Sequence, residues 1–91
     1  MQCKPIKKIS ATSKFIRSLK KLPRSVQDKV DKREQIFRSD AFDPRLGTHK
    51  LKGHLKDFWA YSVDNRYRVV FEFDNGDEAV YHDVGDHEVY R

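Results

Sequence analysis

The sequence contains little cysteine and no long apolar run. Its single cysteine, Cys3, cannot form an internal disulfide and does not supply the paired thiols of a metal site. We therefore expect a protein of the reducing cytoplasm. No apolar segment approaches the length that a membrane span requires, and the first residues lack the hydrophobic stretch of a signal peptide. We expect no membrane partner.

Proline and glycine are also scarce, with 3 and 4 copies in 91 residues, which is too few for a flexible linker. Internal repeats and low-complexity tracts are absent from the sequence as well. A chain of this length can build one modest core, so we expect a single domain covering residues 1–91. The same size excludes a multi-domain enzyme.

Charge is distributed unevenly along the chain. Residues 1–56 contain 16 Lys and Arg against 5 Asp and Glu, whereas residues 57–91 contain 3 against 9. The net charge of +5 indicates a polyanionic partner. The positive field should be concentrated in the first half and in the loop that leads into the second half.

Helical periodicity is present between residues 13 and 38. Apolar residues recur at helical spacing from Ser13 to Leu22, and again from about Arg24 to Arg38. Thr12 or Ser13 can cap the first helix, and Pro23 ends it. Two amphipathic helices joined by a Leu-Pro break predict an αα-hairpin.

A sheet is predicted mainly in the second half, where aromatic and β-branched residues are frequent. Strands are expected at Phe58–Val63, Arg66–Phe73 and Glu78–Val84, with two-residue turns at Asp64-Asn65 and Asn75-Gly76, and an edge or joining strand at Pro5–Ser10. The helices need an apolar surface to cover. The expected fold class is α+β, with two N-terminal helices packed on one face of a small, mainly antiparallel twisted sheet.

Two-residue turns would fix which residues share a face of this sheet. The predicted core face contains His82 as a packed histidine, together with Phe58, Ala60, Tyr67, Val69, Phe71, Val80 and Val84. The predicted opposite face contains Trp59, Tyr61, Arg68, Tyr81 and Asp83. Aromatic rings can stack on bases and arginine can bind phosphate, so this second face is suited to nucleic acid. For Trp59, packing as an ordinary strand aromatic is an alternative to stacking on a base.

Histidine, arginine and tyrosine can together cleave RNA without a metal. A base removes the 2′-OH proton, an acid protonates the leaving 5′ oxygen, and cations stabilise the phosphorane. Arg68 is the central candidate, with a cross-strand ion pair to Asp83 as a compatible alternative role. In the basic loop we favour a functional role for His49 and a solvated surface role for His54. For His87, near the end of the chain, both roles stay open.

Several motifs together carry a resemblance to a known family. The elements and motifs follow in the order helix, Leu-Pro break, helix, HKLKG, W-x-Y-x-V, YRVVFEF and V-G-x-H-x-V-Y. In this order, over nearly the whole chain, the sequence resembles the RelE/ParE superfamily of toxins from bacterial toxin–antitoxin pairs. YRVVF and the terminal EVY are similar to the RelE branch, which implies roles in mRNA cleavage for Arg68 and Tyr90. The HKLKG loop and G-x-H are similar to the YafQ-like branch, which implies catalytic roles for His49 and His87.

The chain also departs from both branches. Trp59 and Tyr61 stand where the RelE branch has strand lysines, so no lysine base is expected on that strand. Ser62 and Arg66 stand near the positions where YafQ-like toxins have a histidine and an aspartate. The expected catalytic site is therefore a hybrid of His49, His87, Arg68 and Tyr90.

The resemblance implies a ribosome-dependent, metal-independent endoribonuclease that cuts mRNA by 2′-OH attack. It implies a cognate antitoxin, the ribosome and mRNA as partners, and no small-molecule cofactor. The expected substrate-binding residues are Lys50, Lys52, His54, Lys56, Trp59, Tyr61, Arg66 and Arg91. One alternative is a ParE-like toxin that binds DNA gyrase without cleaving anything, and another is a nucleic-acid-binding module without activity. The histidines and Tyr90 argue against a pure binder.

Overall fold

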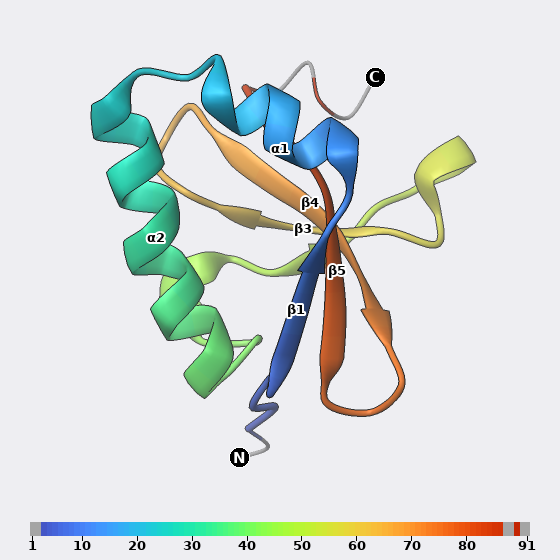
Figure 1. Cartoon of the computed structure of the whole chain (residues 1–91). Helices are drawn as coiled ribbons and strands as arrows, with labels where there is room; N and C mark the ends of the chain where they lie inside the picture. The colour runs from blue at the N-terminus through green and yellow to red at the C-terminus, as the bar shows by residue number, and fades with distance from the viewer. Residues whose placement is uncertain (1–2, 87–88, 90–91) are drawn as a thin grey trace.

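The structure, a computed structural model, describes residues 3–86 and 89 and places helices over one face of a sheet (Figure 1). The sheet that these residues form has the strand order β1-β5-β4-β3-β2. Its strands are β1 Lys8–Ala11, β2 His49–Lys50, β3 Trp59–Ser62, β4 Arg68–Asp74 and β5 Glu78–Gly85. β1 is parallel to β5, and the other neighbouring pairs are antiparallel. The α+β class is confirmed, with a mixed sheet.

Two α-helices follow β1 in the described chain, α1 Ser13–Lys20 and α2 Arg24–Ser39. Thr12 caps α1 as predicted, because its side-chain oxygen accepts a hydrogen bond from the N–H of Phe15. Figure 1 shows the two helices running in clearly different directions over the sheet. The predicted hairpin, in which they would pair with each other, is not confirmed. Neither described helix is long and apolar enough to cross a membrane.

Aromatic side chains fill the space between helices and sheet. The ring of Phe15 in α1 lies 5.1 Å from that of Tyr81, and the ring of Phe37 in α2 lies 5.1 Å from Tyr61 and 4.8 Å from Phe71. The Tyr61 and Tyr81 hydroxyls are hydrogen-bonded at 2.7 Å. Burial raises the pKa of both phenols well above the usual range. The side of the sheet that faces the helices is therefore the core.

The connection between β3 and β4 differs from the predicted two-residue turn. Ser62 pairs with Arg68, and the five residues 63–67 form the loop between them. The pairing is therefore shifted by one residue from the prediction, and a shift of one exchanges the faces of a strand. Tyr61 lies in the core, although it was predicted on the opposite face, and Ala60 projects away from the helices.

The β4–β5 hairpin is also one residue longer than predicted. Asp74 pairs with Glu78, and Asn75 and Gly76 have the positive φ values, 33° and 42°, expected at this turn. A bulge then places an extra residue, His82, between Tyr81 and Asp83 on β5. The longer turn moves Tyr81 into the core and His82 out of it, against the prediction.

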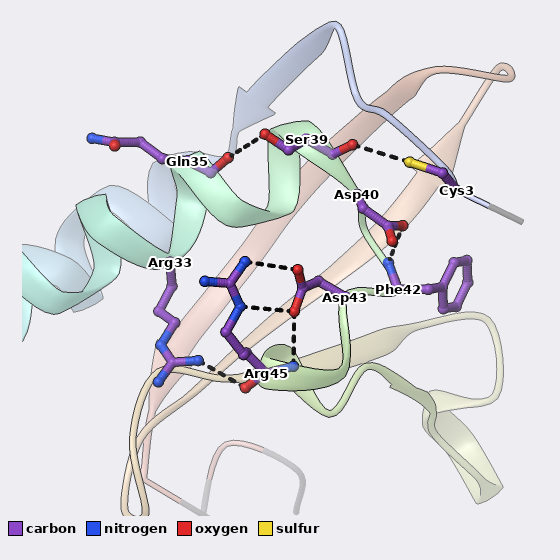
Figure 2. A network of polar contacts seen from close by, with 8 residues as sticks. All are labelled: Cys3, Arg33, Gln35, Ser39, Asp40, Phe42, Asp43 and Arg45. Carbon is purple, nitrogen blue, oxygen red and sulfur yellow. Dashed lines mark hydrogen bonds and ion pairs between the residues drawn. The ribbon is translucent and has the colours of Figure 1, made fainter. Parts of the chain in front are cut away.

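A polar network holds the chain between α2 and β2 (Figure 2). Asp43 accepts a hydrogen bond from the backbone N–H of Arg45 and pairs with its guanidinium at 2.8 Å. The Arg45 side chain, followed by its backbone N–H, lowers the pKa of Asp43 to about 2. Arg33 on α2 donates to the Arg45 carbonyl at 2.7 Å. These contacts fix the 3₁₀ turn Pro44–Leu46, so the chain enters β2 from a defined point.

Candidate functional site

The face of the sheet turned away from the helices, called the open face below, carries two of the predicted catalytic residues. His49 pairs with Ala60, and Ala60 pairs with Val70, so these three form one row across the sheet. Ser62 and Arg68 form the next row. Directly paired residues project to the same side. The register therefore brings His49 and Arg68 onto the same face.

The Arg68 side chain is half-buried and held by the β3–β4 loop. Its Nη1 donates to the backbone carbonyls of Asp64, at 2.6 Å, and Tyr67, at 3.0 Å. A guanidinium has five N–H donors, and both of these bonds use one terminal nitrogen. The remaining edge of the fork can bind a phosphate in two-point fashion.

The loop that holds Arg68 is itself ordered by the Asp64 carboxylate. Its Oδ1 accepts from the backbone N–H groups of Arg66 and Tyr67, both at 2.8 Å, and its Oδ2 pairs with Lys29 at 3.1 Å. Partial burial raises the pKa of Asp64, but the N–H groups and Lys29 outweigh it, so the pKa lies below its ordinary value. The carboxylate is therefore charged at neutral pH and stabilises the loop.

His49 is exposed at the outer strand of the sheet. Its ring Nδ1 lies 3.0 Å from the carbonyl oxygen of Gly47, a contact that Nδ1 makes as a donor. This hydrogen bond orients the imidazole from the loop that precedes β2. A ring held in this way can transfer a proton through its other nitrogen.

A pocket of about 280 Å³ opens on the same face. Its lining combines apolar and polar side chains, from Thr12, Lys14, Leu55, Phe58, Val70, His82, Asp83 and Val89. Val70 belongs to the row that contains His49, so the pocket adjoins the candidate residues. Phe58 was predicted in the core but lines this pocket, because the pairing of β3 is shifted.

His82 and Glu72 form a hydrogen-bonded pair at this pocket. The His82 Nε2 lies 2.7 Å from Glu72 Oε1, and the imidazole meets the ring of Phe58 edge-on at 4.8 Å. The prediction of a packed core histidine was wrong about the face, because the β4–β5 turn is one residue longer than predicted. The turn length is set by pairing between the strands, so the local sequence pattern did not identify this pair.

Asp83 is held by residues of α1 and not by Arg68. Its Oδ1 accepts from the hydroxyl of Ser18 at 2.6 Å and from the backbone N–H of Val84 at 2.9 Å, and its Oδ2 lies 3.4 Å from Lys14 Nζ. It pairs across the sheet with Val70, and Arg68 pairs with Gly85. The proposed cross-strand pair of Arg68 and Asp83 is therefore wrong.

The two aromatic residues predicted to stack on bases lie on the helix side. Tyr61 is fully buried in the core. Trp59 is half-buried, with its ring 5.5 Å from Phe42 and 5.2 Å from Phe73. Neither ring is on the open face, so the predicted stacking platform is absent there.

The predicted basic contacts are at the surface. Exposed side chains are those of Lys50, Lys52, His54, Lys56 and Arg66, and the Arg66 guanidinium lies 5.3 Å from the centre of the Tyr67 ring. Lys52 and Lys56 flank the short 3₁₀ turn Gly53–Leu55, which contains His54. Leu55 lines the pocket, and Lys56 directly follows it in the chain.

Three predicted site residues, His87, Tyr90 and Arg91, lie outside the described residues. Their roles stay predictions. Among residues 3–86 and 89, no group of three or more His, Cys, Asp and Glu side chains is arranged to hold a metal ion.

Comparison with known proteins identifies the fold. No family model and no curated protein matches the chain. Solved structures do match. The toxin–antitoxin complex RelBE2 from Mycobacterium tuberculosis has a TM-score of 0.77 at 18% identity, with 91% of this chain and 93% of that chain covered.

Two further toxins match with slightly lower TM-scores. YafQ from E. coli has a TM-score of 0.74 at 12% identity, with 89% of this chain and 93% of that chain covered. The YoeB/ParE toxin from Agrobacterium tumefaciens has a TM-score of 0.74 at 14% identity, with 89% of this chain and 99% of that chain covered. The chain therefore has the fold of the RelE/ParE toxins, as the sequence motifs predicted.

Proposed function

We propose that this chain is the toxin of a toxin–antitoxin pair and that it cleaves mRNA on the ribosome. The observation that carries the proposal is the placement of His49 and Arg68 on one face of the sheet, beside a pocket. The fold alone does not determine an activity, because one fold can serve several functions. The chemistry of this face supports cleavage of a phosphodiester.

The proposed reaction is attack of the ribose 2′-OH on the adjacent phosphorus. A general base removes the 2′-OH proton, the P–O5′ bond breaks, and a general acid protonates the departing 5′ oxygen, which leaves a 2′,3′-cyclic phosphate. His49 supplies one of the two proton transfers, and His87 is proposed for the other. Arg68 binds the non-bridging oxygens as negative charge develops on them. Tyr90 is proposed to position the substrate.

The proposed partners follow from the charge and from the similar structures. The excess of Lys and Arg in residues 1–56 favours an RNA backbone, in the cytoplasm where ribosomes work. One matching structure is a toxin–antitoxin complex by name. We infer a cognate antitoxin for this chain, with an acidic segment that covers the basic surface.

The test is expression of the chain without an antitoxin, followed by primer extension on cellular mRNA. We expect translation arrest and discrete cleavage sites within coding regions. Arg68→Ala should reduce the cleavage rate by a factor on the order of 100, the effect of losing one preorganised charge-stabilising group. His49→Ala should slow cleavage by a similar factor. Arg17→Ala, an exposed arginine of α1, is the matched control and should cleave normally.

A gyrase-binding toxin is the second candidate, because the name of one matching structure includes ParE. Such a toxin would cause DNA damage while protein synthesis continues. Intact mRNA together with DNA damage would therefore refute the nuclease and favour the gyrase binder. Unchanged toxicity of both Arg68→Ala and His49→Ala, with mRNA still cut, would instead refute the assignment of the site.

A further inference from the structure

We propose that the pocket on the open face binds one nucleobase of the RNA and prefers a base with an amino group over uracil. The inference rests on the proposed nuclease function, and it names the part of the substrate that the pocket takes. The polar group that reads the base is the Asp83 carboxylate. The pocket's size, its wall and the geometry of Asp83 each support this assignment.

The size and the walls of the pocket suit a planar base. Its volume of about 280 Å³ is that of a small ligand site, and apolar surface comes from Leu55, Phe58, Val70 and Val89. The Phe58 ring is held edge-on against His82, 4.8 Å between ring centres, and His82 is held by Glu72 at 2.7 Å. A fixed aromatic wall favours a ligand with a flat apolar surface, as a nucleobase has.

Asp83 presents an acceptor of fixed direction at the edge of the pocket. Its Oδ1 is held by the Ser18 hydroxyl and the Val84 N–H, at 2.6 and 2.9 Å. Its Oδ2 has the Lys14 ammonium at 3.4 Å, which is longer than a strong charge-assisted hydrogen bond. Oδ2 can therefore accept a further hydrogen bond from a ligand N–H.

A carboxylate at this point selects among the parts of a nucleotide. It repels a phosphate, and it accepts from the amino groups of cytosine, adenine or guanine. Uracil has the O4 carbonyl where cytosine has its amino group, so at that position it would place an acceptor against the Asp83 carboxylate. Lys14 is exposed beside the carboxylate and can contact the phosphate of the same nucleotide.

The same lining argues against an apolar side chain of a protein partner as the occupant. Half of the residues that form the pocket are polar or charged, namely Thr12, Lys14, His82 and Asp83. An apolar side chain would shield the Asp83 carboxylate from water and offer its Oδ2 no hydrogen bond, and that costs free energy. A nucleobase offers N–H and C=O groups to these polar side chains.

The test is titration of the isotope-labelled protein with 5′-CMP and 5′-UMP, followed by NMR. We expect CMP to bind roughly tenfold more tightly than UMP, the usual effect of one base-edge hydrogen-bond pattern. The amide signals of Leu55, Phe58 and Val70 should move. Because no cleavage is needed, this readout is independent of the proposed nuclease activity.

Asp83→Asn gives the sharper result. The Asn oxygen can keep the bonds from Ser18 and Val84, which leaves its NH₂ group facing the pocket as a donor. The preference should then reverse, with UMP bound more tightly than CMP. Asp77→Asn, at the β4–β5 turn, is the matched control and should keep the CMP preference. Phe58→Leu should weaken both nucleotides about equally, roughly tenfold.

Each outcome has a defined meaning. Equal binding of CMP and UMP, or shifts confined to residues outside the pocket, would overturn the inference. Unaltered nucleotide binding by the Asp83 and Phe58 variants, with weakened antitoxin binding, would show that the pocket docks a protein. If RNA is cut without any base preference, the pocket assignment fails while the nuclease stands. If CMP binds as expected and no RNA is cut, the pocket assignment stands and the nuclease fails.

Discussion

At the scale of single residues, the two phenols of the core depend on each other. The Tyr61 and Tyr81 hydroxyls are buried and hydrogen-bonded at 2.7 Å. Tyr61→Phe removes one partner and leaves the Tyr81 hydroxyl buried without it, so we expect a loss of about 1–3 kcal/mol in the free energy of unfolding. The measurement is urea denaturation followed by fluorescence.

The double variant tests whether this loss comes from the hydrogen bond. Replacing both Tyr61 and Tyr81 by Phe removes both polar groups, and such a change can be nearly neutral. The double variant should therefore be more stable than the sum of the two single losses predicts. Strictly additive losses would contradict a direct interaction between the hydroxyls.

At the scale of elements, the β3–β4 loop links stability to pH through Asp64. Its pKa in the folded chain lies below the ordinary value of 3.8. The charged carboxylate therefore contributes stability above about pH 3.8, and this contribution is lost as the pH falls through the folded pKa. Asp64→Asn removes this titration, so the variant should lose less stability than the wild type in that acidic range.

The matched control for Asp64 is Asp31→Asn, which removes a negative charge from an exposed site on α2. Urea denaturation from pH 6 down to about pH 3 measures both variants against the wild type. If Asp64→Asn and the wild type lose stability in parallel, the loop carboxylate does not stabilise the fold. In that case the carboxylate would not be the group that orders the loop around Arg68.

Periodicity predicted the elements better than their pairing. The helices, the N-terminal strand and the strands of the second half were all expected, because apolar spacing and the Thr12 cap are local features of the sequence. The connection 63–67 and the bulge at His82 depend on contacts between strands, which no local pattern encodes. One residue of difference was enough to move Tyr61 and His82 to the other face.

The same limit applies to the candidate site. His49 and Arg68 were identified as site residues from residue type, loop charge and motif. Their identification does not depend on the turn length alone. The pocket residues Phe58, His82 and Asp83 could not be grouped, because the sequence does not show that α1, the bulge and the segment before β3 meet at one place. Their assembly is a property of the tertiary fold.

At the scale of the whole molecule, charge separates the chain into two parts. Residues 1–56 carry most of the Lys and Arg, whereas residues 57–91, which supply three of the sheet strands, are acidic overall. RNA should therefore contact the open face through basic groups that the first part brings to its border. Lys52 and Lys56, on either side of the turn Gly53–Leu55, are the clearest of these.

Salt dependence measures how many of these groups bind phosphate. For single-stranded RNA, the logarithm of the binding constant falls with the logarithm of salt concentration, with a slope of about −0.7 for each phosphate contact. Replacing both Lys52 and Lys56 with Ala should make the slope shallower by about 1.4. The control replaces Lys20 and Lys21, at the C-terminal end of α1, and should leave the slope unchanged.

Fluorescence anisotropy of a labelled RNA measures the binding constant of each double variant between about 50 and 200 mM KCl. RNA binding changes strongly over this range, so the slope of each variant can be determined. The Arg68→Ala background slows cleavage of the RNA during the measurement and lowers the starting slope equally in every variant. Equal slopes for the two double variants would mean that RNA does not pass along the turn Gly53–Leu55. A shallower slope for the Lys20 and Lys21 variant alone would place the RNA on the helix layer, away from His49 and Arg68.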